Sequence, residues 1–171
     1  MSLLDRLLRR TPDPREALRP LWHATVVAAR DPLWYRELGV ADSVEGRFDM
    51  ITLTLALVLL RLEREPAQAD AAARLTELFV EDMDAQLRQS GVGDLVVGKH
   101  MGKLMATLGG RLGALREALP LGAEQLTAVV ERNVSLVAGA QPEPLAEALT
   151  RLHASWSRMP VEAMLAGRLA P

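Results

Sequence analysis

The chain has 171 residues, a formal net charge of −2, 49% hydrophobic and 4% aromatic residues, and no cysteine. This length and apolar content are typical of one globular domain, and the scattered basic residues give no electrostatic footprint for DNA or RNA. Disulfides and thiolate metal sites are excluded, and because the three histidines lie far apart in the sequence, we expect neither a metal nor another cofactor.

Residues 1–12 form a first segment with an amphipathic pattern. Its apolar positions are Leu3, Leu4, Leu7 and Leu8, with three arginines beside them. The pattern fits a short helix that makes peripheral contact with a membrane, although one such helix binds lipid weakly without a second anchor. It also fits a terminal helix that docks on the protein's own core. The segment lacks the long apolar region and cleavage site of a secretory signal, so we expect the protein to stay in the compartment where it is made.

Residues 13–171 are expected to form one compact, multi-helix, all-α domain, because Ala, Leu and Arg abound while aromatic residues are few. The first two helices are predicted at about 14–30 and 32–38, each opened by an Asp-Pro pair. Ser43 can cap a long third helix, which must end before Pro66.

The third helix contains the most apolar run of the chain, MITLTLALVLL at 50–60. The run is about half of the roughly 20 residues that a membrane-spanning helix needs. Because it is apolar on every face, we expect this helix to be buried at the centre of the fold.

Further helices are predicted at about 67–90, 95–119, 123–138 and 143–157, and almost no sheet is expected. The helix at 95–119 contains five glycines, which weaken the prediction that it is continuous.

Residues 93–100, GDLVVGKH, fit the phosphate-loop pattern G-x-x-x-x-G-K-[ST] at every position but the last. A phosphate loop follows a strand and holds magnesium with a hydroxyl group. Here a predicted helix precedes the segment, and His100 stands in place of the hydroxyl residue. We therefore do not expect nucleotide binding.

Two polar residues, Asp82 and Gln86, fall on or beside the apolar face of the helix at 67–90. A carboxylate there needs a partner, because an unpaired buried charge is strongly destabilising. The basic candidates are Arg47, Lys99 and Arg111. Asp82 is then either a paired anchor that holds two helices in register or a direct contact for a ligand or partner.

The glycine-rich helix carries a row of small residues at three- or four-residue spacing. The row consists of Gly98, Gly102, Ala106, Gly109 or Gly110, and Gly113. Such a row is nearly free of side chains, so another backbone can approach it closely. The only two lysines of the chain, Lys99 and Lys103, lie beside it, one turn apart. The row either packs against the protein's own helices or forms a docking groove for a foreign helix.

Three blocks of sequence follow one another in a specific order. They are WYRELGVADSVEGRFDMITLTLALVLLRL at 34–62, FVEDMDAQLRQSGVGDLVVGKHMGKL at 79–104, and Gly110-Arg111. Together they resemble the ubiquinol-cytochrome c chaperone family, the assembly factors of respiratory complex III. The resemblance covers about residues 20–138, departs from the family pattern at 107–109, where aromatic residues are common, and does not extend to the tail after Pro142.

The resemblance implies a non-enzymatic, all-helical assembly chaperone that binds newly made cytochrome b and assists the maturation of ubiquinol-cytochrome c reductase. Mitochondrial relatives are implied to work near the ribosome, which makes the ribosome a second expected partner. The lack of a targeting peptide and the preference for Arg over Lys look like a bacterial relative. Such a relative is expected in the cytoplasm or peripherally on the inner face of the plasma membrane.

Partner-contacting residues are expected among a small set of charged residues and glycines. The set is Arg47, Asp82, Gly98, Lys99, Gly102, Lys103 and Arg111. Two other classes of function stay open. A helical interaction scaffold at the ribosome or membrane surface would show a basic patch without an apolar groove. An enzyme for a small anionic ligand held by Arg47, Lys99 and Lys103 would need a concave pocket with a titratable group of perturbed pKa.

Overall fold

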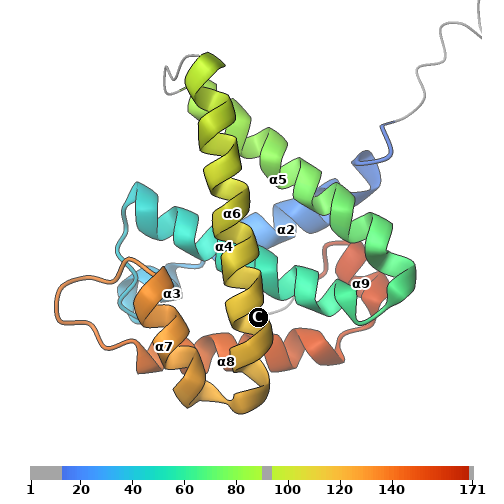
Figure 1. The fold of residues 1–171 in the computed structure, drawn as a ribbon. Coiled ribbons are helices and arrows are strands. Elements are labelled where there is room, and N and C mark those ends of the chain that lie inside the picture. Colours follow the sequence, from blue (N-terminus) through green and yellow to red (C-terminus); the bar gives the residue numbers. More distant parts are fainter. Residues whose placement is uncertain (1–12, 90–93, 170–171) are drawn as a thin grey trace, which may run out of the picture.

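The computed structural model describes residues 13–89 and 94–169 of the chain. The helices, labelled as in Figure 1, are α2 (Arg19–Ala29), α3 (Pro32–Arg36), α4 (Val44–Glu63), α5 (Ala69–Gln89), α6 (Asp94–Ala118), α7 (Ala123–Asn133), α8 (Glu143–Arg158) and α9 (Val161–Leu165). Short 3₁₀ turns lie at Glu16–Leu18, Pro66–Gln68 and Leu119–Leu121. Within the described residues, strand-like pairing is limited to one isolated antiparallel bridge between Val40 and Leu136, so the prediction of an all-α fold is confirmed.

Side-chain caps open α3 and α4 where the sequence predicts them. The carboxylate of Asp31 accepts a hydrogen bond from the backbone N–H of Leu33 at 2.9 Å, and the Ser43 hydroxyl accepts one from Gly46 at 3.1 Å. Each bond satisfies one of the N–H groups that the first helical turn leaves without a partner.

Helix α4 is the buried centre of the fold, as predicted. Its residues from Met50 to Leu59 are all buried, and α2, α5, α6 and α8 pack around it. In Figure 1, α6 runs down the front of the molecule across α4, while α8 lies along the bottom. None of the described helices combines the length and apolarity needed to cross a bilayer.

The glycine-rich helix α6 is continuous from Asp94 to Ala118 in spite of its five glycines. Its inner face carries Leu108 and Leu115, which are 3% and 0% exposed. Burial of this face accounts for the helix, because tertiary packing overrides weak intrinsic propensity.

Two parts of the C-terminal half differ from the prediction. Helix α7 ends at Asn133 instead of continuing to 138, because the next residues become extended and pair with the loop before α4. The backbone N–H of Ala41 donates to the carbonyl of Ser135 at 2.8 Å. The short helix α9, which follows Pro160, is absent from the prediction and packs against α2.

The end of the described chain closes against the start of α2. Gly167 has a φ of +73°, and a Cβ atom at this position would lie 2.5 Å from the carbonyl oxygen of Pro20. Both the positive φ and the close approach favour glycine here. The amphipathic segment 1–12, with its predicted docking or membrane contact, lies outside the described residues.

Candidate functional site

The small residues of α6 face outward. Gly98, Gly102, Gly109 and Gly110 are exposed, and a Cβ atom added at any of them would meet nothing within 4 Å among the described residues. The same holds for Gly113. At about 100° per residue, the row lies on the side of the helix opposite its buried face. Between the two interpretations of the row, the structure excludes packing against the described helices of the same chain.

The glycines have no packing role that would explain their presence. Each glycine in a helix interior is less stable than alanine by roughly 0.5–1 kcal/mol, so the five together lower the stability of α6 by a few kcal/mol. A tight internal contact would justify this loss, yet all five positions face open space. The row, from here on called the α6 strip, therefore leaves its backbone accessible to another molecule.

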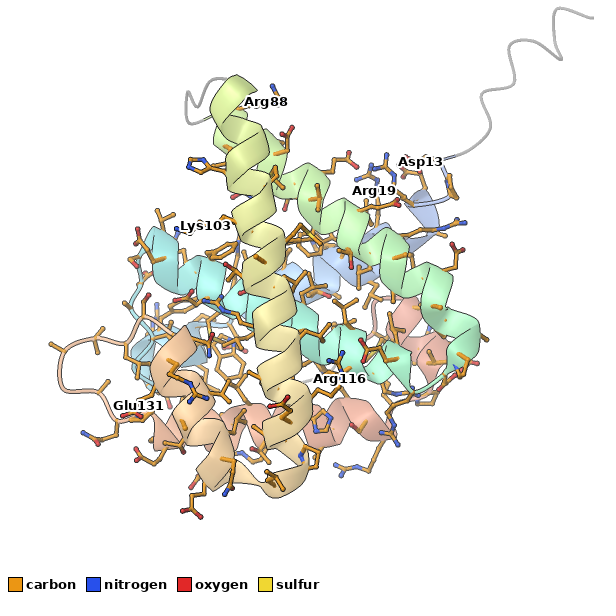
Figure 2. All side chains as sticks on the ribbon, viewed as in Figure 1. Asp13, Arg19, Arg88, Lys103, Arg116 and Glu131 are labelled. Carbon is orange, nitrogen blue, oxygen red and sulfur yellow. The ribbon has the colours of Figure 1, made fainter. Side chains whose placement is uncertain are left out.

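An apolar groove lies between α4, α5 and α6, on the inner side of α6 that carries Leu104. Its volume is about 390 Å³, and it is lined mainly by side chains of three helices. These are Val44, Arg47, Phe48 and Ile51 of α4, Met83, Gln86 and Leu87 of α5, and Leu104 of α6, with Arg30 at the end of α2. The neighbouring Lys103 is exposed on the side of α6 that faces left in Figure 2. The fold thus brings Arg47 toward the glycine-rich helix, which the sequence separates from it by about fifty positions.

Arg47 makes a surface ion pair rather than a contact with Asp82. Its Nε atom donates to Oδ1 of Asp42 at 2.7 Å, and this hydrogen bond lowers the pKa of the Asp42 carboxyl. Both side chains are more than half exposed, so the pair contributes little to stability.

Arg111 is buried and pairs with Asp49, which corrects the expectation that it reaches Asp82 or a partner surface. The two side chains are 8% and 9% exposed, and the Arg111 guanidinium donates to Oδ1 of Asp49 at 2.5 Å and to the carbonyl of Asn133 at 2.7 Å. The second carboxylate oxygen of Asp49 accepts hydrogen bonds from the N–H and the hydroxyl of Ser135, both at 2.8 Å. This buried network joins α4, α6 and the segment after α7.

Sequence reasoning considered Asp82 as the buried acid and missed Asp49. The signal lay in the sequence, because Asp49 directly precedes the most apolar run of the chain, on a helix without a polar face. Asp82 itself is only half-buried on α5. Of its three proposed partners, Arg47 and Arg111 pair elsewhere, and the side chain of Lys99 lies outside the described part of the structure.

A second depression, of about 520 Å³, lies on the other side of α6, between acidic residues of α5 and Met105. Glu81 at its rim pairs with Arg15 at 3.0 Å and with Arg19 at 3.7 Å. Figure 2 shows Asp13 and Arg19 beside α5. The hydrogen bonds from Arg15 lower the pKa of Asp13 to about 2. Through Glu81, the acidic side of α5 is already paired with Arg15 and Arg19.

Comparisons with known proteins identify the family of the chain. The family model described as ubiquinol-cytochrome C chaperone matches residues 36–170. The chain belongs to this family. A search of curated proteins gives no match.

A solved structure supports the same assignment for this chaperone. The crystal structure of the Cbp3 homolog from Brucella abortus superposes with a TM-score of 0.79 at 29% sequence identity. The alignment covers 99% of this chain and 96% of that chain, so the similarity extends to the C-terminal region, for which the sequence blocks gave no signal.

Proposed function

We propose that this chaperone captures newly made cytochrome b by docking one of its membrane helices along the α6 strip. The observation that carries the proposal is the open space in front of the glycines of α6. A transmembrane helix approaches a partner most closely where small residues leave the backbone uncovered, and the contact then rests on van der Waals packing over the length of the strip.

The surroundings of the α6 strip suit such a client. Met105 is 39% exposed next to Ala106 of the strip, and the apolar groove with Phe48 and Leu104 lies on the inner side of the same helix. Lys103 offers a flexible charge for polar groups at the ends of the client helix. Gly98, Gly102 and Lys103 are therefore proposed as direct contacts, with Arg47 at the rim of the groove. Asp82 and Lys99 stay in the proposal on the sequence argument alone, and Arg111 is left out because it is buried.

The proposed activity is holding and release, without a chemical step. The family supports a chaperone role in the assembly of ubiquinol-cytochrome c reductase. We infer that the protein acts in the cytoplasm at the inner face of the plasma membrane, close to the ribosome, where cytochrome b emerges.

The test replaces Gly102 by leucine. The new side chain covers the α6 strip, so the yield of crosslinks to cytochrome b made in a cell-free translation system with membranes should fall several-fold. Because the position faces open space, the melting temperature should stay unchanged or rise. Lys103→Glu should reduce the crosslinks more weakly at an unchanged melting temperature.

The matched control is Ala128→Leu, which adds the same exposed leucine to α7. It should leave the crosslink yield at the parental level. Parental yields in well-folded Gly102→Leu protein would remove the α6 strip from the mechanism. Crosslinks to ribosomal proteins in the same reaction would report the proposed contact with the ribosome.

A further inference from the structure

A second hollow, lined by arginines, adjoins the apolar groove. This hollow has a volume of about 400 Å³, and its walls are Arg30, Pro32, Tyr35, Arg36, Asp42 and Arg47. Arg30 and Arg47 line both spaces. The two spaces therefore adjoin, one apolar and one basic, and are together called the α2–α4 depression from here on.

Two of the three arginines are available for an outside anion. Arg47 is paired with Asp42, whereas Arg30 and Arg36 have no carboxylate within ion-pair distance in the part of the chain that the structure describes. Both are exposed at the mouth of the hollow. Asp42 balances Arg47, so the basic end keeps two uncompensated positive charges.

Tyr35 forms part of the wall that also carries the arginines. Its hydroxyl donates to the carbonyl of Ala29 at 2.9 Å, which fixes the ring in the wall of the hollow. Burial raises the pKa of Tyr35, and the positive charges of Arg47 and Arg30 act in the opposite direction. Arg30, Arg36 and Arg47 line the same hollow as this ring.

An exposed apolar side chain accompanies each of the three arginines, and one of them, Val44, lines the groove. Val27, Leu33 and Val44 are 57%, 40% and 80% exposed, and each stands three residues before one of the three arginines. Residues three apart on a helix are neighbours, so each arginine has an exposed apolar side chain beside it. Surfaces that lie in the headgroup region of a membrane combine apolar and basic side chains in this way.

We propose that the α2–α4 depression binds an anionic phospholipid. The phosphate lies between Arg30 and Arg36, where the planar guanidinium groups can each donate two hydrogen bonds. One acyl chain follows the groove along Phe48, Met83 and Leu104, and Val27, Leu33 and Val44 enter the surrounding lipid. This contact supplies the second anchor that the amphipathic segment 1–12 needs for stable attachment to a membrane.

A phospholipid fits the depression better than a free phosphate ion does. Phosphate alone would use the basic end and leave the adjoining apolar lining in contact with water. The apolar groove, about 390 Å³, and the adjoining basic hollow, about 400 Å³, each have the size of an ordinary ligand pocket. The proposal can be tested apart from client capture, because the proposed client contacts Gly98, Gly102 and Lys103 do not line the depression and Arg36 does not line the groove.

The first experiment measures sedimentation of the full chain with phosphatidylcholine vesicles, with and without phosphatidylglycerol. The double variant Arg30→Gln/Arg36→Gln should bind the phosphatidylglycerol vesicles about 25-fold more weakly, since each arginine near an anionic surface contributes about 5-fold. The control Arg132→Gln/Arg158→Gln makes the same change of net charge at exposed arginines of α7 and α8 and should bind like the parent. All variants keep residues 1–12, so the contribution of that segment is the same in each.

The second experiment separates the phospholipid from its headgroup. Dihexanoyl phosphatidylglycerol, which is soluble, should shift the backbone amide resonances of Arg30, Arg36 and Phe48 in a saturable way, whereas inorganic phosphate should bind at least tenfold more weakly. Equal losses in the test and control pairs, or equal affinity for phosphate and phospholipid, would overturn the proposal. Equal binding of the parent protein to vesicles with and without phosphatidylglycerol would also overturn the proposal. The melting temperatures of both double variants should match the parent, because all four arginines are exposed.

Discussion

Removal of the Asp49 carboxylate should strongly destabilise the fold. In Asp49→Ala, the buried guanidinium of Arg111 loses its only carboxylate among the described residues, and Ser135 loses the acceptor of two hydrogen bonds. Leaving one charge of a buried ion pair without its partner costs about 3–5 kcal/mol. A loss of this size is a large fraction of the roughly 5–15 kcal/mol that stabilises a typical domain.

Urea unfolding followed by circular dichroism measures this loss, and thermal unfolding should show a melting temperature lower by about 10 °C. The double variant Asp49→Leu/Arg111→Met removes both charges and fills the space with apolar atoms. It should recover most of the stability, because a buried ion pair contributes little relative to a well-packed apolar pair. A loss below about 1 kcal/mol in Asp49→Ala would show that water or other groups satisfy Arg111. A double variant as unstable as the sum of the two single variants would show that the charges are not coupled.

Two further predictions concern stability. Gly102→Ala should raise the free energy of unfolding by about 0.5–1 kcal/mol, whereas Gly46→Ala should lower it, since a Cβ atom at Gly46 would collide with the backbone carbonyl of Ala41. Urea unfolding of both variants tests this contrast, and equal effects would contradict it. Burial and the nearby charge of Arg64 lower the pKa of His153, so the unfolded chain takes up the proton first and stability falls as the pH drops below about 6.5. His153→Gln should reduce this fall between about pH 7 and 5 in urea titrations, and an unchanged pH profile would assign the fall to other groups.

The central helix could be predicted because its sequence leaves no alternative. An apolar run such as 50–60 has no face suited to water, so it must be surrounded. The starts of α3 and α4 were equally predictable, because Asp31 and Ser43 satisfy N–H groups within their own helices. These features depend only on residues close together in the sequence.

The early end of α7 and the pairing of Arg111 could not be predicted in the same way. Both depend on how α4, α6 and the segment after α7 meet in space. The Asp49 carboxylate binds both Ser135 and Arg111. Arg111 pairs with Asp49 instead of Asp82 because of how these segments align in space, which the sequence does not reveal. The direction of the α6 strip lies between the two cases. The helical spacing alone places the strip opposite Leu108 and Leu115. It does not decide which of the two faces is outside, because small residues packed between two helices of the same protein have the same spacing.

The contact of α9 with α2 has a consequence for the order of events during synthesis. Translation makes α2 early, yet the side of α2 that meets α9 stays uncovered until nearly all of the residues described have left the ribosome. The same delay applies to the carbonyls of Ser157 and Met159, which accept hydrogen bonds from Arg64 and Arg61 at the end of α4. Contacts between such distant parts of a chain form slowly, because a long loop must close before they give any stability. A chaperone built in this way completes the packing around α2 and the end of α4 only after α9 has left the ribosome, so these contacts form last although α2 and α4 are made early.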